Sequence, residues 1–421
     1  MKHLLLSATC ILCLAGCGGG PSVKQGPIPE EQIAQPEVQQ PAPTIKVFVE
    51  NSGSMDGYVK GETDFKNAVY SYLSDLQHAD LGLKTSSKNI LQLNYINSRV
   101  LQQKPDLDAF IKALEPADFK KKGGDRTTSD MSNMFKTIIN QTNENDVSLF
   151  ISDCIFSPGR NQNPLKFIGT QQIAIKGHIL EKINTMPDFS VVVMRLKSQF
   201  NGTYYNKFDE RQQINNERPF YMWLMGDRAY LKAILDEVAL TQIKGKGVQN
   251  LFMISKPLAE LPYTISVPQP GSGKYKIDMK SKNTITRAKT DKFGSERRFK
   301  VALNVDFSNL LLPEEYILDP QNYKVSNSAY EVEVVKNPGA NSKTHTVYLK
   351  LKQQIISRGI VTISLLNKLP SWSETYTDES GLDIMEPGAM EKTYGLKYLL
   401  GGVYDAYATD KQYGSITINI Q

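Results

Sequence analysis

A short apolar run, a polar loop and a helical pattern follow one another near residue 45, and this order restricts the fold most strongly. Residues 45–49 (IKVFV) are rich in β-branched and aromatic side chains, which indicates a strand. A polar, glycine-containing loop spans residues 50–57, and apolar residues then recur with helical spacing between Phe65 and Leu76. The same alternation continues to residue 255. It predicts an α/β fold with a doubly wound, Rossmann-like sheet.

The other elements of this first region are predicted in the same way, from the residue patterns typical of strands and of helices. Residues 91–96 and 100–101 should pair as an antiparallel hairpin, because only three residues join them. Residues 198–218 are polar and are interpreted as an insertion. The other expected elements are strands at 147–151, 191–194, 219–225 and 250–254, and helices at 106–115, 129–140, 168–185 and 228–240.

The pattern changes at about residue 256. From there to residue 421, short alternating apolar and polar runs are separated by Pro, Gly and Asn, which predicts a β-sandwich-like domain. Near its end, residues 394–404 carry the spacing of an amphipathic helix, and residues 415–420 form a last strand. The stretch 274–300 is strongly basic. It is interpreted as a solvated face, with contact to an anionic lipid, glycan or protein as the alternative.

The N-terminus carries the pattern of a lipoprotein leader. Residues 1–16 combine Lys2 with an apolar run and form the expected signal peptide. The sequence Leu14-Ala15-Gly16-Cys17 resembles the lipobox of bacterial lipoproteins, which implies that Cys17 carries the lipid. Residues 17–44 are rich in Pro and Gly and form the expected linker. A lipid anchor in the outer membrane, on its periplasmic face rather than the cell surface, is the favoured location; a plain secretory signal is the alternative.

Composition excludes several classes of function. The formal net charge of +5 is spread along the 421 residues, too thinly for a nucleic-acid-binding surface. Cys154 is the only cysteine outside the leader and the lipidation position, so a disulfide framework or a cysteine zinc site is excluded.

Three polar loops of the first region are expected at one edge of the sheet. Loop 50–54 follows the first strand, residue 153 follows the strand at 147–151, and loop 123–129 enters a helix between them. Ligands of such sheets bind at the carboxyl ends of the strands. Carboxylate and hydroxyl oxygens suit a hard cation, Mg²⁺ or Ca²⁺. The candidate ligands are Glu50, Ser52, Ser54, Thr127 or Thr128, and Asp153.

These loops resemble the metal-ion-dependent adhesion site of the von Willebrand factor A domain. In that family an Asp-x-Ser-x-Ser motif follows the first strand, a threonine lies in a later loop and an aspartate follows the fourth strand. Glu50 stands here where the family usually has aspartate. The resemblance implies a divalent cation with an open coordination position for an acidic residue of a protein partner. Side chains expected around its rim are Met55, Tyr58 and Arg126.

The sequence leaves more than one function open. The favoured hypothesis is a lipid-anchored binding module for a protein of the cell envelope. The alternative is a hydrolase in which Ser52 or Ser54 is the nucleophile or the cation activates water. The sequence has no Gly-x-Ser-x-Gly motif and no histidine near these loops, which favours binding over catalysis. A purely structural role without metal is the third possibility.

Overall fold

A computed structural model describes residues 43–81, 89–127, 129–157, 163–338, 344–381, 383–408 and 411–421. The predicted signal peptide, Cys17, nearly all of the predicted linker and Thr128 lie outside the described residues. Residues 40–421 form one compact unit. Within the described ranges, no helix has the length and apolar character needed to span a membrane.

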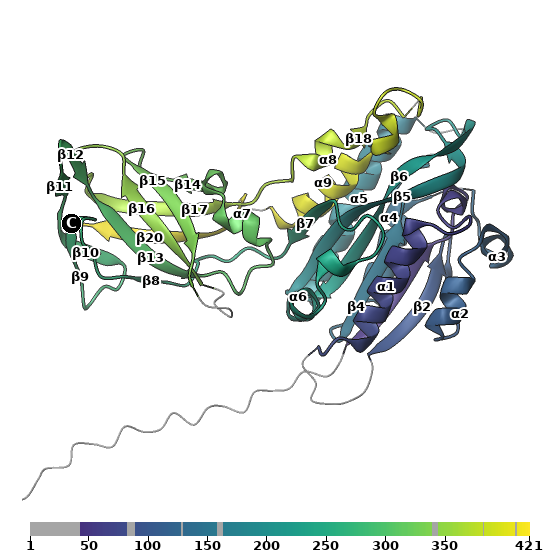
Figure 1. The fold of residues 1–421 in the computed structure, drawn as a ribbon, viewed down its shortest axis with the longest axis horizontal. Coiled ribbons are helices and arrows are strands. Elements are labelled where there is room, and N and C mark those ends of the chain that lie inside the picture. Colours follow the sequence, from purple (N-terminus) through teal and green to yellow (C-terminus); the bar gives the residue numbers. More distant parts are fainter. Residues whose placement is uncertain are drawn as a thin grey trace, which may run out of the picture. The chain divides into compact units, whose positions relative to one another are not determined.

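The first half of the chain builds a mixed sheet whose seven described strands lie in the order β3-β2-β1-β4-β6-β5-β7 (Figure 1). β1 is parallel to β2 and to β4, and the other neighbours are antiparallel. The alternation of strands and helices is therefore confirmed as a mixed α/β fold. The strands are β1 (Thr44–Glu50), β2 (Ile90–Ile96), β3 (Val100–Gln102), β4 (Asp146–Ser152), β5 (Phe189–Tyr205), β6 (Arg211–Asp227) and β7 (Asn250–Ile254).

Helices cover both faces of this sheet because the central strands are apolar on both sides. Ile45, Val47 and Val49 pack into one core with the apolar side of α1, whereas Phe48 belongs to a second core with α4 and α5. The side-chain period of two in β1 thus divides the core into two layers. The helical elements are α1 (Asp64–His78), α2 (Leu107–Lys112), α3 (Pro116–Lys121), α4 (Met131–Gln141), α5 (Pro164–Thr185) and α6 (Arg228–Glu237), with short 3-10 turns η1 (Ser54–Gly57) and η2 (Leu240–Gln242).

The polar stretch 198–218 was predicted to be an insertion, but most of it belongs to two strands of the sheet. β5 and β6 pair along their whole length from Phe189↔Asp227 to Tyr205↔Arg211, and residues 206–210 join them. This long ribbon reaches η1, where Gly202 and Gly57 approach so closely that a Cβ on Gly202 would lie 2.7 Å from the Gly57 Cα. The ribbon therefore covers the loop that follows β1.

The second half of the chain consists of antiparallel and mixed sheets. Two larger sheets have the strand orders β14-β17-β20-β10-β9 and β15-β16-β13-β8, and β11 pairs with β12. The elements are β8 (Tyr263–Ile265), β9 (Lys274–Ile277), β10 (Thr284–Lys289), β11 (Asp291–Phe293), β12 (Glu296–Arg298), β13 (Lys300–Asp306), α7 (Glu314–Leu318), η3 (Pro320–Asn322), β14 (Tyr323–Val325), β15 (Tyr330–Lys336), β16 (Thr344–Leu351), β17 (Gly359–Leu366) and β20 (Gln412–Ile420).

Between β17 and β20 the chain returns to the first half. The predicted C-terminal helix is α9, and it packs on α5 even though the sequence grouped it with the β-rich region. Gly402 makes this contact close, because a Cβ there would lie 2.7 Å from the Gln172 carbonyl oxygen. The returning segment contains α8 (Trp372–Thr375), β18 (Thr377–Asp378), η4 (Ala389–Glu391), β19 (Thr393–Tyr394) and α9 (Leu396–Tyr407).

Candidate metal centre

Glu50 is the last residue of β1, and its carboxylate is completely buried. Its Oε1 accepts a hydrogen bond of 2.8 Å from the Ser129 hydroxyl, which lies just before α4. Its Oε2 accepts a short hydrogen bond from the Ser152 hydroxyl at the end of β4. The carboxylate thus joins three segments that are distant in sequence, as expected where parallel strands end at one edge of a sheet.

Asp153 follows β4 directly and is also completely buried. Its Oδ1 accepts a hydrogen bond of 3.2 Å from the Ile155 amide, whereas Oδ2 has no hydrogen-bond partner among the described residues. A buried carboxylate oxygen without a partner is costly. This atom is therefore available to a ligand that carries positive charge or donates a hydrogen bond.

A strained turn places Asp153. Cys154 has φ = 56°, in the left-handed region that side chains with a Cβ rarely adopt. Its amide donates to the Ser152 hydroxyl over 2.7 Å, and its Sγ accepts a hydrogen bond of 3.3 Å from the Trp223 indole. The buried thiol is thus a packing group at this strained position, and burial raises its pKa well above the usual range.

Ser52 and Ser54 bring two hydroxyls to the same edge, with their Oγ atoms 2.9 Å apart. Arg126 fixes the backbone of this loop. Its Nε donates to the Asn51 carbonyl oxygen and side-chain oxygen at 3.2 and 2.7 Å, and its Nη2 donates to the Ser52 carbonyl at 3.0 Å. The same guanidinium forms an ion pair with Asp56. Arg126 therefore holds the serine loop in place in addition to lining the space above it.

The structure places the other predicted residues differently. Thr127 is exposed, and its hydroxyl donates to Asp125 over 2.6 Å, so it does not contact Glu50. Ser129 makes that contact instead, and Thr128 lies outside the described residues. Met55 and Tyr58 are completely buried, because the β5–β6 ribbon covers them, and so they do not line a rim as the sequence suggested.

Ser129 and Ser152 were not predicted as parts of the site. Ser129 was inside the loop that the sequence singled out, and Ser152 directly precedes Asp153. The available sequence signal for Ser152 was therefore its position next to Asp153, an expected ligand. Which hydroxyl of 127–129 points at Glu50 depends on how the chain enters α4, which residue type alone does not fix.

Burial dominates the electrostatics of the two carboxylates. It raises the pKa of Glu50 to about 7, and the negative charge of Asp153 adds to the rise. Burial also raises the pKa of Asp153, although the Ser54 hydroxyl, the Ile155 amide and the charge of Arg218 lower it in part. Two buried acids of like charge disfavour full ionisation, and a bound cation would remove that penalty.

A cavity of about 670 Å³ opens above the serines. Ser52, Ser54 and Ser129 line it, whereas Glu50 and Asp153 do not, so the hydroxyls stand between the cavity and the carboxylates. The ribbon and α3 supply the walls. The charged lining residues are Lys60, Lys120, Arg126, Arg211, Asp56 and Asp209, which leaves a surplus of positive charge around the opening.

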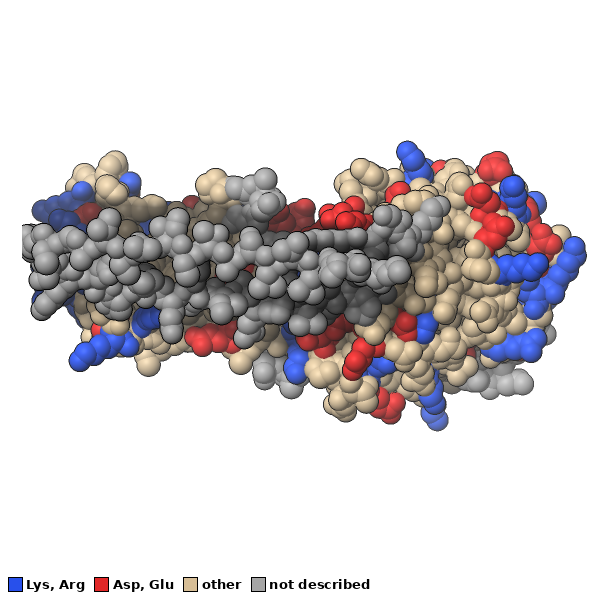
Figure 2. Space-filling model, turned by 90° about the horizontal axis from the view of Figure 1, so that it is seen from below, with Lys and Arg blue, Asp and Glu red and all other residues tan. Residues whose placement is uncertain are grey.

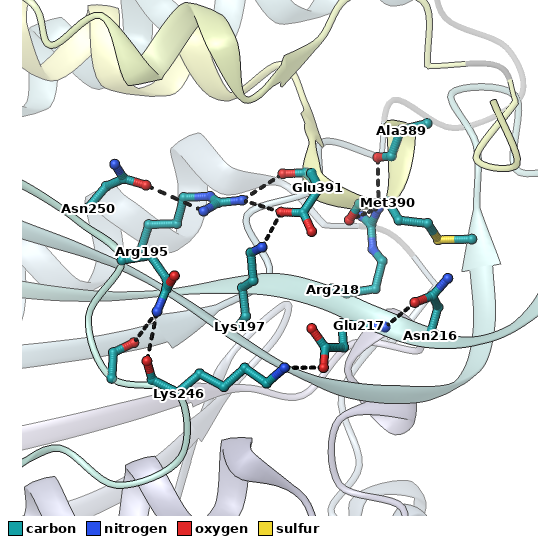
Figure 3. Close-up of polar contacts among 12 residues, drawn as sticks. Arg195, Lys197, Asn216, Glu217, Arg218, Lys246, Asn250, Ala389, Met390 and Glu391 are labelled. Carbon is teal, nitrogen blue, oxygen red and sulfur yellow. Dashed lines mark hydrogen bonds and ion pairs between the residues drawn. The ribbon is translucent and has the colours of Figure 1, made fainter. Parts of the chain in front are cut away.

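Beside this centre, three cations, two of them buried, connect the returning C-terminal segment to the ribbon (Figure 3). Arg195 is 1% exposed and donates to the Glu391 carbonyl over 2.8 Å, and Lys197 forms an ion pair of 2.5 Å with the Glu391 carboxylate. Arg218, also buried, points at the carbonyls of residues 389–390. The position of η4 thus depends on Arg195, Lys197 and Arg218. The positive charge of Arg218 also lowers the pKa of Asp153 in part.

The oxygen donors fit a hard divalent cation. Mg²⁺ is commonly held by one or two carboxylates, with water completing an octahedron. The described residues contain no group of three or more His, Cys, Asp or Glu side chains arranged to hold a metal, so serine hydroxyls and water would have to supply the remaining ligands here. The unpartnered Asp153 Oδ2 is the observation that supports an ion at this position.

Comparison of the chain with protein-family models, with curated proteins and with solved structures finds no match. The functional argument therefore depends on the residues and geometry described above.

Proposed function

We propose that this protein binds a divalent cation, Mg²⁺ or Ca²⁺, at the carboxyl ends of β1 and β4, and uses it to bind a protein partner of the cell envelope. Asp153 and Glu50 supply the charge, with Ser52 and Ser54 as hydroxyl ligands. The buried Asp153 Oδ2 without a hydrogen-bond partner carries this proposal. Ser129 and Ser152 orient Glu50, and they take the role that was predicted for Thr127 or Thr128.

We also propose that the first half of the chain is a von Willebrand factor A-like domain and that the second half is β-sandwich-like. The strand order β3-β2-β1-β4 and the antiparallel β2–β3 hairpin support a von Willebrand factor A-like domain with a site similar to its metal-ion-dependent adhesion site. The other half of the sheet differs from a doubly wound sheet, because β6 lies antiparallel beside β4. In the second half of the chain, the two larger sheets support the β-sandwich-like description.

The cavity determines which partner groups suit this site. A cation held by Glu50 and Asp153 is about neutralised by these two carboxylates, so its attraction for a further carboxylate is small. Lys60, Lys120 and Arg211 at the cavity add positive charge around the opening, which favours an acidic partner segment. A carboxylate of that segment would replace water on the ion while the surrounding cations pair with its neighbours.

Capture from detergent-solubilised envelope tests this function. Immobilised residues 40–421 should capture a partner in the presence of Mg²⁺ or Ca²⁺, and should lose it on chelation or in the Asp153→Ala variant. Asp209→Ala, which removes an acid of the cavity wall and no proposed ligand, is the matched control and should retain capture. Capture that survives both chelation and Asp153→Ala would place the interface elsewhere.

The hydrolase alternative has less support. The hydroxyls of Ser52 and Ser54 contact each other, and the described histidines lie on other elements: His78 in α1, His178 in α5 and His345 in β16. A serine nucleophile needs a base within hydrogen-bond reach, and among the described residues no histidine lies in these loops. Binding therefore remains the better proposal.

We also propose that Cys17 anchors the chain to the outer membrane, facing the periplasm, through the lipobox-like sequence. The Cys17→Ala variant should leave the membrane fraction and lose the mass of the acyl chains, since attachment would depend on them. Serine at position 7 is outside the lipobox, so Ser7→Ala is a suitable control and should fractionate as the unmodified protein does. An unacylated Cys17 together with unchanged fractionation would contradict the anchor.

A further inference from the structure

One end of the β-rich region brings together segments that are distant in sequence. The Gly273 amide donates to Asp291 Oδ2 over 3.2 Å, and the Lys300 amide donates to the Ser272 carbonyl over 2.8 Å. The Leu351 amide donates to the Phe299 carbonyl over 2.9 Å. Arg358 reaches the carbonyl of residue 288. We call this surface the basic end and define it as residues 270–274, 287–300 and 350–360.

Positive charge is in excess at the basic end. Four acids lie among or beside the described segments: Asp291 and Glu296 within them, and Glu331 and Glu333 on the adjoining β15. Glu296 pairs with Arg298, and Glu331 and Glu333 both pair with Lys350. Blue side chains are visible at the left end of Figure 2, where Figure 1 places β11 and β12. Within the described residues of the basic end, the exposed cations that form no ion pair are Lys274, Arg287, Lys289, Lys292, Arg297, Lys352 and Arg358.

Large apolar side chains are exposed among these cations. Phe293 in the β11–β12 hairpin is 60% exposed, Ile355 is 79% exposed and Ile360 is 70% exposed. The Arg298 guanidinium lies 3.8 Å from the centre of the Phe293 ring, so charge and apolar surface are in direct contact. Phe293, Ile355 and Ile360 therefore add exposed apolar surface to the end of the region that carries the unpaired cations.

We propose that the basic end docks on the surface of a bilayer that contains anionic lipid. The unpaired cations complement lipid phosphates, and each basic side chain near such a surface strengthens binding. Phe293, Ile355 and Ile360 gain by entering the acyl boundary, which a polysaccharide or another polyanion in water does not offer. This contact is separate from the proposed metal centre and does not depend on it.

The predicted lipid anchor at Cys17 favours a bilayer as the surface that the basic end binds. A lipid on Cys17 would keep the β-rich region close to a bilayer, so that even a weak second contact is occupied because the effective concentration is high. A cavity of about 840 Å³ adds a concave surface for headgroup phosphates. Its charged lining residues are Arg297, Arg298, Lys300, Lys350 and Lys352, with Glu296, Glu331 and Glu333, so positive charge is in excess. Docking would thus make a second membrane contact beyond the lipid anchor.

Flotation with vesicles tests the proposal. Residues 40–421, which lack the predicted anchor and form one compact unit, should float with vesicles of phosphatidylethanolamine and phosphatidylglycerol at low ionic strength, but not with phosphatidylcholine alone. The triple variant Lys289→Gln, Lys292→Gln, Arg297→Gln should bind about 100-fold more weakly. The double variant Phe293→Ser, Ile355→Ser should bind at least about ten-fold more weakly. All replaced residues are exposed, so the urea midpoints should match that of the unmodified protein.

The turn 278–283 provides a matched control, because it lies at the opposite end of the β9–β10 hairpin from Lys274↔Lys289. Met279 there is 92% exposed and is followed by Lys280 and Lys282. The variant Met279→Ser, Lys280→Gln, Lys282→Gln should float as the unmodified protein does. Failure of the unmodified protein to float, or an equal loss in this control, would overturn the proposal. Unchanged binding by the Phe293→Ser, Ile355→Ser variant, with competition by dextran sulfate, would identify a polyanion surface instead.

Discussion

Replacing Gly202 by alanine is expected to destabilise the protein by about 2 kcal/mol, because overpacking of a close contact costs roughly 1–3 kcal/mol. The added Cβ would lie 2.7 Å from the Gly57 Cα and 3.0 Å from the Gly57 nitrogen. Both are backbone atoms, so relief requires η1 or the ribbon to move. Since η1 begins at Ser54, one of the proposed ligands, the same change should disturb the candidate metal centre. The midpoint of urea unfolding measures the loss.

Gly177 in α5 gives the matched control. A Cβ there meets no atom within 4 Å, and alanine in a helix interior is favoured over glycine by roughly 0.5–1 kcal/mol. Gly177→Ala should therefore raise the midpoint while Gly202→Ala lowers it. Equal effects of the two substitutions would show that the ribbon does not approach η1 as described.

Glu50→Gln is expected to remove the contribution of Glu50, about 3 kcal/mol, to a fall in stability between pH 4.5 and 7 in chelator, leaving only the smaller part due to Asp153. The folded state holds the Glu50 proton up to a pKa of about 7, compared with an ordinary value of 4.5. Below pH 4.5 both states are protonated and folding carries no penalty. As the pH rises, the unfolded chain ionises first, and this lowers its free energy relative to that of the folded state. The fall is complete above pH 7. Measuring the free energy of unfolding of both proteins across this range isolates the contribution of Glu50.

Asp146 provides a contrasting buried acid. It forms an ion pair of 2.6 Å with Lys46, so its charge has a partner that Glu50 lacks. Asp146→Asn should lower the free energy of unfolding at pH 7, because Lys46 loses its counter-charge, whereas Glu50→Gln should not. A Glu50→Gln protein that keeps the full pH-dependent fall would assign the raised pKa to another group.

Local sequence patterns were sufficient for the elements near the site. Residues 45–49 and the helical spacing of Phe65 to Leu76 are strong periodic signals, and the structure confirms β1 and α1 there. The carboxyl-end rule then places Glu50 and Asp153 at one edge of the sheet, where both lie buried. These predictions succeeded because each depends on only a few neighbouring residues.

The ribbon was missed because apolar and polar residues alternate only weakly in the end of β5 and the start of β6, and these segments face solvent on one side. Residues 198–218 contain too few apolar side chains to distinguish a strand from a loop. The burial of Met55 and Tyr58 was missed for the same reason, since the ribbon is what covers them. Pairing of β6 with β4 is a contact between distant segments, which no local pattern encodes.

Unfolding of residues 40–421 in urea, with and without Mg²⁺, Ca²⁺ or Mn²⁺, tests the proposed metal centre most directly. Binding to the folded state should add about 2.7 kcal/mol at a hundredfold excess of cation over Kd. The gain should increase from pH 5 to pH 8, because the cation competes with the proton on Glu50. Asp153→Ala should remove this gain. A free energy of unfolding that none of the three cations changes at millimolar concentration would contradict a metal centre at Glu50 and Asp153.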